Sequence, residues 1–279
     1  MITYRSRSYT PEAFEHAFNP RIAAFDTDRS VEQRARMSAE TRARLASTSG
    51  IRYGERPREF FDYFPAGRGA PLLLYIHGGY WRGGQALDNH FVADAFVAAG
   101  IAVAVLNYDL CPQVKLGDIV AQVQRALPIV TAKLAAEGAD PSRLVLAGHS
   151  AGAHLAAMML TPAWRSPVAV QGAVLVSGIY DVEPALSTTV NADIRATTDD
   201  VPRYSPLRLP IALAVPLVVT AGAAEPEGWR EQSVSYAAHA RAHGCRVHYA
   251  ETSGDDHYGA IFRIRDAGDA LTRAALALF

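Results

Sequence analysis

Residues 144–158 read LVLAGHSAGAHLAAM, and this stretch decides how the rest of the chain is interpreted. The apolar run 144–147 predicts a buried strand, and the alanine-rich segment 153–160 predicts a helix. Between them stands the pattern G-x-S-x-G, with Ser150 at its centre. A serine between a strand and a helix adopts a strained turn, and the flanking glycines let backbone and helix approach closely. The turn exposes the serine oxygen at a helix amino terminus, where free N–H groups favour negative charge. The pattern alone is common, but this setting favours Ser150 as a nucleophile.

Outward from this turn, short apolar runs alternate with segments of helical period. The runs cover residues 72–76, 101–106, 144–147, 173–176 and 217–220. Such runs are typical of strands buried on both faces of a parallel sheet. Of the helical segments, 116–134 contains Pro128, which is expected to kink or interrupt it, and 229–243 is expected to end at Gly244. The alternation predicts an α/β fold, a mostly parallel central sheet with helices on both faces, and residues 58–64 are expected as an antiparallel edge strand.

Two regions depart from the alternation. Residues 1–50 form a polar arm that is expected to be partly helical, and residues 178–210 are expected as a small cap over the carboxyl edge of the sheet, where ligands of such sheets bind. No linker or repeat divides the chain, so we expect a single domain over residues 1–279. The arginines of the arm are interleaved with acids and are interpreted as a solvated helix face rather than a phosphate-binding patch: Arg34, Arg36, Arg42 and Arg44.

Composition excludes several classes of partner. The 279 residues carry a formal net charge of −1, which favours neither nucleic acid nor an anionic membrane as a binding partner. No apolar run approaches the roughly 18 residues of a membrane span, and the amino terminus lacks an apolar signal core. Cys111 and Cys245 are too few for a disulfide framework and are expected as free thiols. No H-x-x-H or C-x-x-C spacing is present, so we expect no metal and no cofactor in a cytoplasmic protein.

A glycine pair follows the strand predicted at 72–76, in the sequence HGGYW of residues 77–81. In α/β hydrolases of the lipase and esterase kind, a loop of this type presents backbone N–H groups to an oxyanion, and glycines are needed because side chains would block the donors. The expected donors are the N–H groups of Gly78, Gly79 and Ala151. Tyr80 and Trp81 are candidates for packing against a substrate ring; the alternative is an ordinary glycine turn with Trp81 as part of the core.

The general base is expected late in the chain, because the order on this fold is serine, acid, histidine. His257 stands in the loop between the strand-like segment 245–250 and the last helical segment, where a base belongs. For the acid, the loop after the strand at 217–220 offers Glu225 first and Glu227 second, and Asp181 after the strand at 173–176 is a third candidate. An acid in any of these positions would hold the imidazole tautomer.

Together these residues resemble the kynurenine formamidases (arylformamidases), a branch of the α/β-hydrolase superfamily. The resemblance is distributed over most of the chain, and HGG-x-W with GHSAGAH is more specific than either motif alone. The matching segments are NPR (19–21), HGGYW (77–81), NYDLCP (107–112), GHSAGAH (148–154), SGIYD (177–181), SP (205–206) and QS (232–233).

The resemblance implies that Ser150, Glu225 and His257 are nucleophile, acid and base. The family more often has Asp at the position of Glu225. It also more often has Phe where this chain has Tyr258, and the tyrosine would alter the pocket wall. It implies an α/β-hydrolase that cleaves N-formyl arylamines such as N-formylkynurenine, a small-molecule substrate, and formation of a homodimer. The alternatives are a carboxylesterase with the same catalytic residues and, third, a non-enzymatic binding protein on a hydrolase scaffold.

Overall fold

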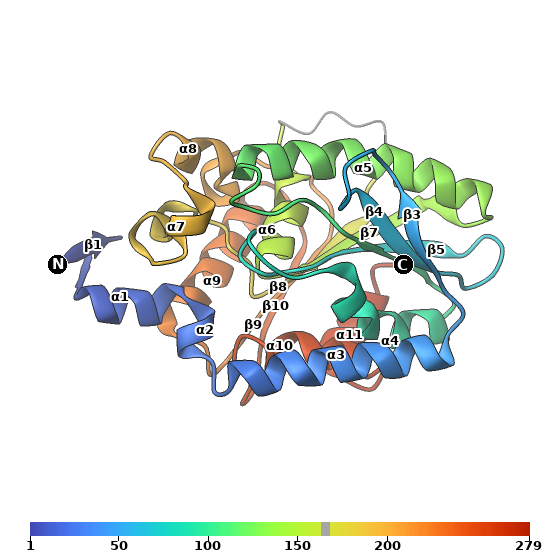
Figure 1. Ribbon diagram of the computed structural model, residues 1–279, viewed down its shortest axis with the longest axis horizontal. Helices are drawn as coiled ribbons and strands as arrows, with labels where there is room; N and C mark the ends of the chain where they lie inside the picture. Colours follow the sequence, from blue (N-terminus) through green and yellow to red (C-terminus); the bar gives the residue numbers. More distant parts are fainter. Residues whose placement is uncertain (163–167) are drawn as a thin grey trace.

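The computed structural model describes residues 1–162 and 168–279, and a mostly parallel sheet runs through its centre (Figure 1). The order of strands across this sheet is β10-β9-β8-β7-β5-β6-β4-β3. All pairs from β10 to β6 are parallel, and β4 and β3 are antiparallel additions at one side. The predicted fold class is therefore confirmed. The strands are β3 (Thr48–Arg52), β4 (Phe60–Phe64), β5 (Pro71–Ile76), β6 (Ala102–Leu106), β7 (Asp140–His149), β8 (Gly172–Val176), β9 (Leu217–Gly222) and β10 (Val247–Thr252).

The prediction that residues 58–64 form an edge strand is wrong in one respect. β4 is antiparallel, but it pairs with β6 on one side and with β3 on the other, so β3 is the edge. The side chains of β3 are mostly exposed, with only Ile51 half-buried. A strand without a buried face shows no alternation of apolar and polar residues, which is why the sequence pattern did not reveal it.

Helices cover both faces of the sheet because the central strands are apolar on both sides. In β5, Leu72, Leu74 and Ile76 belong to one hydrophobic cluster, while Leu73 and Tyr75 belong to another, as expected for side chains that alternate across a strand. The first cluster includes residues of α5 (Leu116–Ala136), α6 (Ala151–Met158) and α9 (Glu227–Ala242). The second includes residues of η1 (Ala86–Val92), α4 (Ala93–Ala98), α10 (Gly259–Phe262), η4 (Arg263–Arg265) and α11 (Ala270–Leu276).

Two of the helical predictions need adjustment. Helix α5 runs through Pro128 without interruption, and the Thr131 hydroxyl donates to the carbonyl of Leu127 at 2.9 Å in this turn. The last helical segment, expected after His257, consists of three short helices, α10, η4 and α11, whose inner residues Ile261, Ile264 and Leu271 all belong to the second cluster. Within the described part of the chain, no helix combines the length and the apolar character needed to cross a membrane.

The amino-terminal arm packs against two parts of the chain, its hairpin and first helix against the carboxyl-terminal half and its long helix against η1. It consists of a hairpin, β1 (Ile2–Tyr4) and β2 (Arg7–Tyr9), followed by α1 (Pro11–Phe18), α2 (Pro20–Ala23) and α3 (Thr27–Arg44). Arg7 of the hairpin pairs with Glu231 of α9 at 2.7 Å. Helix α1 contacts α9, and in Figure 1 α3 runs along the side of the sheet that α4, α10 and α11 cover. The arm is therefore placed by contacts that are distant in sequence.

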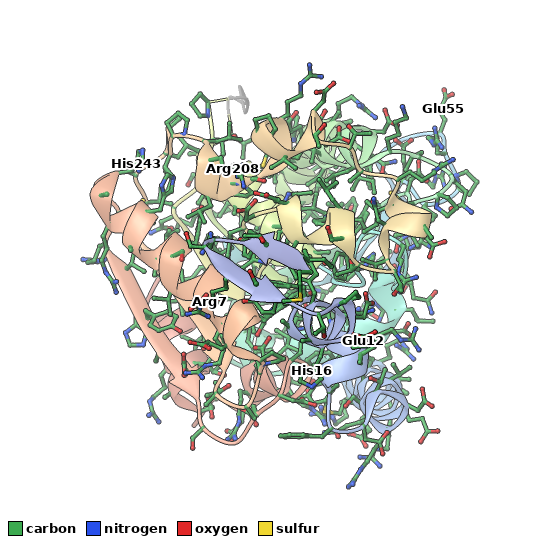
Figure 2. The ribbon with its side chains drawn as sticks, turned by 90° about the vertical axis from the view of Figure 1, so that its left-hand side faces the viewer. Arg7, Glu12, His16, Glu55, Arg208 and His243 are labelled. Carbon is green, nitrogen blue, oxygen red and sulfur yellow. The ribbon has the colours of Figure 1, made fainter. Side chains whose placement is uncertain are left out.

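Residues 183–208 form short helices rather than a separate domain core. These are η2 (Glu183–Ser187), α7 (Asn191–Ile194), α8 (Asp200–Tyr204) and η3 (Pro206–Arg208). The segment is joined to the arm through Asp181, which accepts hydrogen bonds from the Tyr4 hydroxyl at 3.0 Å and from Arg208 at 3.1 Å. Figure 2 looks onto this junction, with the hairpin between Arg208 above and the first arm helix below.

Candidate active site

Ser150 occupies a sharp turn between β7 and α6. Its backbone has φ +56° and ψ −120°, a left-handed conformation that non-glycine residues adopt only under constraint. The Ser150 N–H donates to the Val176 carbonyl at 2.9 Å, and a Cβ at Gly152 would collide with the carbonyl of Ile76. The turn therefore depends on the flanking glycines, as the sequence pattern predicted.

His257 and Glu225 lie together, each in a loop after one of the last two strands. The Nδ1 of His257 donates to Oε2 of Glu225 at 2.8 Å, and both side chains are buried. The other carboxylate oxygen of Glu225 accepts from the Ser177 hydroxyl at 2.5 Å and from the Gly222 N–H at 2.6 Å. The carboxylate is thus held by three donors, and its orientation toward His257 is fixed.

The other two acid candidates lie in different surroundings. Asp181 accepts hydrogen bonds from Tyr4 of the arm and Arg208 of η3. Glu227 is the first residue of α9, its side chain is 70 % exposed, and it pairs with Arg7 at 3.3 Å. In the described part of the chain, neither forms a hydrogen bond or an ion pair with His257, so Glu225 is the candidate that the fold brings to the imidazole.

Aromatic and acidic neighbours fix the position of His257. The indole of Trp229 packs edge-on against the imidazole with ring centres 4.8 Å apart, and its N–H donates to the Ser177 carbonyl at 3.0 Å. Asp256 accepts from the backbone N–H of Gly259 at 2.8 Å and from that of Phe25 at 2.9 Å. The loop that carries His257 is therefore anchored both to its own helix and to the arm.

The glycine loop after β5 packs directly on the serine turn. A Cβ at Gly78 would lie 2.8 Å from the His149 carbonyl oxygen and 3.1 Å from Ser150 Cβ, so only glycine fits this approach. Nδ1 of His77 donates to the Gly78 carbonyl at 2.8 Å, which turns the N–H of Gly79 away from His77 because the two groups of a trans peptide point in opposite directions. Ala151 is the first residue of α6, so its N–H has no partner within the helix. The N–H groups of Gly79 and Ala151 therefore stay candidate donors to an oxyanion, as does that of Gly78.

Buried histidines around the turn are neutral. Burial lowers the pKa of His77 to about 3 and that of His154 to about 4. The pKa of His149 also lies well below its usual range, chiefly because of burial and then because of the charges of His257 and Arg34. Nε2 of His149 donates to the His257 carbonyl at 2.8 Å, and its Nδ1 is buried without a partner among the described residues. His149 therefore supports the backbone of His257, a role that its place in the motif did not reveal.

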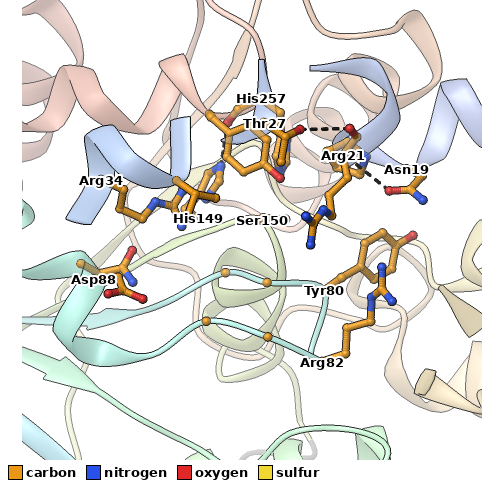
Figure 3. A pocket seen from close by; sticks show the side chains of 18 of the residues that line it. Asn19, Arg21, Thr27, Arg34, Tyr80, Arg82, Asp88, His149, Ser150 and His257 are labelled. Atoms are coloured by element: carbon orange, nitrogen blue, oxygen red, sulfur yellow. Dashed lines mark hydrogen bonds between the residues drawn. The ribbon is translucent and has the colours of Figure 1, made fainter. Parts of the chain in front are cut away.

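A cavity of about 310 Å³ opens above these groups (Figure 3). Ser150, His257, Gly78 and Gly79 all contribute to its lining. The volume falls in the range of small-molecule sites. Tyr80 and Tyr258, both predicted to contact substrate, line it as well, and the arm closes one side with Asn19, Pro20, Arg21, Thr27, Val31 and Arg34.

The prediction that Trp81 contacts the substrate is wrong. Its side chain is fully buried and is absent from the cavity wall. The indole N–H donates to Nδ1 of His154 at 3.2 Å, and the ring of Tyr80 packs on it edge-on. Trp81 is thus a core residue beneath the glycine loop, which was the other interpretation of this position.

Arm residues in the cavity wall are the part of the site that sequence reasoning missed. Arg34 was interpreted as part of a solvated helix face, and Arg21 was noted only as part of a matching segment. Both line the cavity next to Tyr258. The segment NPR at 19–21 was a signal for this role, but nothing in the pattern of α3 separates Arg34 from the arginines that face solvent.

The family of the chain follows from comparisons with known proteins. The model of a family described by the α/β-hydrolase fold matches residues 73–260. The kynurenine formamidase of Danio rerio is 34% identical over 273 residues, covering 93% of this chain and 91% of that protein. The kynurenine formamidase of Salmo salar is 32% identical and covers 97% and 94%. A solved structure from Silicibacter sp. TM1040, described as a candidate thioesterase, superposes with a TM-score of 0.82 at 26% identity, covering 94% of this chain and 98% of that one. With its serine turn, its glycine loop and these relatives, the chain belongs to the kynurenine-formamidase-like branch of the α/β-hydrolase family.

Proposed function

We propose that this hydrolase cleaves the formamide of N-formyl arylamines, such as N-formylkynurenine, to the amine and formate. The observation that carries the proposal is the buried pair of His257 and Glu225 beside the serine turn, with both His257 and Ser150 in one cavity wall. The similarity to kynurenine formamidases over nine-tenths of the chain supports the substrate class.

The first half of the reaction forms a formyl-enzyme. Glu225 holds the proton of His257 on Nδ1, which leaves Nε2 to accept the proton of Ser150. The serine oxygen bonds to the formyl carbon, and the resulting oxyanion accepts hydrogen bonds from the backbone N–H groups of the glycine loop and of Ala151. The C–N bond then breaks as His257 returns its proton to the aryl nitrogen, and the amine leaves.

The second half releases formate. His257 takes a proton from a water molecule, whose oxygen attacks the formyl ester, and the Ser150 oxygen leaves with the proton from His257. The formyl carbon carries only a hydrogen besides its reacting bonds, so the acyl side needs no pocket. The cavity, whose lining includes Tyr80 and Tyr258, is then available for the aryl group.

The direct test is turnover by the purified protein. We expect kcat/KM for N-formylkynurenine to exceed that for p-nitrophenyl acetate, although the ester is chemically the more reactive substrate. A much larger kcat/KM for the ester would refute the formamidase proposal and leave the esterase as the function.

A carboxylesterase is the second candidate, because the same residues cleave small acyl or aryl esters. The structural similarity to a candidate thioesterase favours this alternative. The alcohol or phenol of an ester leaves with less need for a proton than the aniline of a formamide. The two activities therefore differ in their dependence on His257 as an acid. A panel of formamides and esters of matched size would separate them.

The third candidate is a non-enzymatic protein that has the hydrolase fold and only binds ligands. Covalent labelling by a fluorophosphonate probe, lost in Ser150→Ala, would exclude it, whereas no labelling of the intact protein would support it. We also propose a homodimer, on the resemblance to the family alone, and light scattering of the purified protein gives its mass in solution.

A further inference from the structure

The side chain of Arg34 lies in the cavity wall but has no role in the proposed hydrolytic reaction. Its side chain extends from α3 toward His149 and the cavity (Figure 3), and it forms part of the cavity wall. Its Nε and Nη2 atoms are buried, and neither has a hydrogen-bond partner in residues 1–162 or 168–279. A buried donor without an acceptor costs free energy, so a ligand that supplies acceptors at this point would bind favourably.

The geometry of the donor group selects the acceptor. A guanidinium presents its N–H groups as a planar fork, which matches the two oxygens of a carboxylate. The guanidinium carbon of Arg34 lies 5.7 Å from the centre of the Tyr258 ring, so the charge is held beside the residue that follows His257. A carboxylate bound there would be within the same cavity as the reacting bond.

The other charges in the cavity wall do not neutralise Arg34. Arg82 and Asp193 pair with each other at 2.5 Å. Asp88 lies in the wall and accepts from Gln85 at 3.2 Å, and Arg21 is an exposed second cation. Because Arg82 and Asp193 neutralise each other, the charges that remain in the wall are two arginines and one carboxylate. This net positive charge favours an anionic ligand.

An amino group of the ligand would also find an acceptor. Asn89 is buried in η1, against which α3 packs, and its side-chain Nδ2 donates to the Gln85 carbonyl at 2.8 Å. This bond fixes the orientation of the amide and leaves its Oδ1 buried without a partner among the described residues. Unpaired donors on Arg34 and an unpaired acceptor on Asn89 in one wall suit a ligand with an amino-acid head.

We propose that Arg34 is a specificity-determining residue that binds the carboxylate of the substrate, so that the enzyme prefers anionic aryl formamides over neutral ones. The inference rests on the proposed function for the identity of the reaction and extends it to the class of substrate. The arm then has a direct part in substrate selection.

The kinetic test compares Arg34→Gln with Arg36→Gln. Arg36 is on the same helix, its side chain is 71 % exposed, and it approaches Glu40, so it is a matched control. We expect Arg34→Gln to lower kcat/KM for N-formylkynurenine by ~10–100-fold, mainly through KM, because a charge-assisted hydrogen-bond pair is lost. The neutral substrate formanilide should change less than about threefold in kcat/KM, since it has nothing to bind to Arg34. Equal losses for both substrates, or equal losses in Arg36→Gln, would overturn the proposal.

A binding experiment separates this inference from the reaction itself. Calorimetry on Ser150→Ala measures the affinity of kynurenine and of its decarboxylated analogue, neither of which needs turnover. We expect kynurenine to bind at least tenfold more tightly, and the difference to vanish when Arg34→Gln is added. If the difference is present but the intact enzyme does not hydrolyse formamides, the proposed function fails, while the assignment of Arg34 as the carboxylate-binding residue of the cavity stands. If formamides are hydrolysed but the two ligands bind equally, the inference fails and the proposed function stands.

Discussion

Replacing Glu225 by Gln tests the role of the acid with the least disturbance of the fold. In the folded protein, Oε1 of Glu225 accepts from Ser177 and Gly222, and Oε2 accepts from His257. A glutamine has the same shape, and its single oxygen can keep the first two donors. Its NH₂ group must then face Nδ1 of His257, which can no longer be a donor.

The expected loss of activity is large because the proton on the imidazole moves. With Nδ1 as acceptor, the neutral ring carries its proton on Nε2, the atom that must accept the proton of Ser150. The charge that stabilises the imidazolium is also lost. The corresponding Asp→Asn change in serine proteases lowers kcat by ~10⁴. We therefore expect kcat to fall by ~10³–10⁴, which corresponds to about 4 to 5.5 kcal/mol of transition-state stabilisation.

Glu227→Gln is the matched control, since it makes the same chemical change two residues away on an exposed side chain. Both variants are assayed for kcat and kcat/KM with the substrate that the intact enzyme turns over, and thermal melting checks that each is folded. Glu227→Gln is expected to keep its activity within about twofold, as surface changes of this kind are nearly neutral. If folded Glu225→Gln retained more than a tenth of the activity, or if Glu227→Gln lost as much, the assignment of the acid would be wrong.

Three further predictions concern the glycine loop and the buried histidines. Gly78→Ala introduces a Cβ 2.8 Å from the His149 carbonyl oxygen, and the displaced loop should lower kcat by ~10²–10³, as measured by steady-state kinetics; unchanged kcat would show that the loop does not hold the oxyanion. Trp81→Phe leaves Nδ1 of His154 without its donor, so urea titration should find the protein less stable by about 1–3 kcal/mol while KM is unchanged; a raised KM without a loss of stability would return Trp81 to the substrate site. His77 and His154 are neutral when buried, with pKa values lowered by burial to about 3 and about 4. The unfolded chain therefore binds more protons between pH 6.5 and 4, and the free energy of unfolding should fall with falling pH in this window by about 1.4 kcal/mol per pH unit for each histidine; His154→Gln should remove one such contribution from the slope, and an unchanged slope would contradict a neutral His154.

The catalytic candidates were predictable because each follows from a local pattern and from strand order. The serine turn needs glycines on both sides of Ser150, and these are visible in the sequence. Glu225 and His257 stand in the loops after β9 and β10, and parallel strands bring such loops to one edge of the sheet. The residue order left open the choice among three acids. In the structure Glu225 contacts His257, whereas Asp181 and Glu227 bind distant arginines.

The arm was not predictable in the same way, because its position depends on contacts between segments far apart in the chain. Helix α3 is polar over most of its surface, and only Met37, Ser38 and Thr41 are buried. Such a helix gives a weak periodic signal, and which of its arginines faces the cavity depends on how it docks on η1. The interpretation of the arginines as a solvated face holds for Arg36 but not for Arg34.

The arm connects the selection of substrate to the placement of the base. Asp256 accepts the backbone N–H of Phe25, so the segment between α2 and α3 helps to hold the loop of His257. The same segment leads into the helix that carries Arg34. A truncation of the arm would therefore remove the proposed carboxylate site and loosen the base at once, and a loss of activity would not tell the two apart. Arg34→Gln leaves the backbone of the arm in place, so a change that depends on the charge of the substrate can be assigned to the side chain alone.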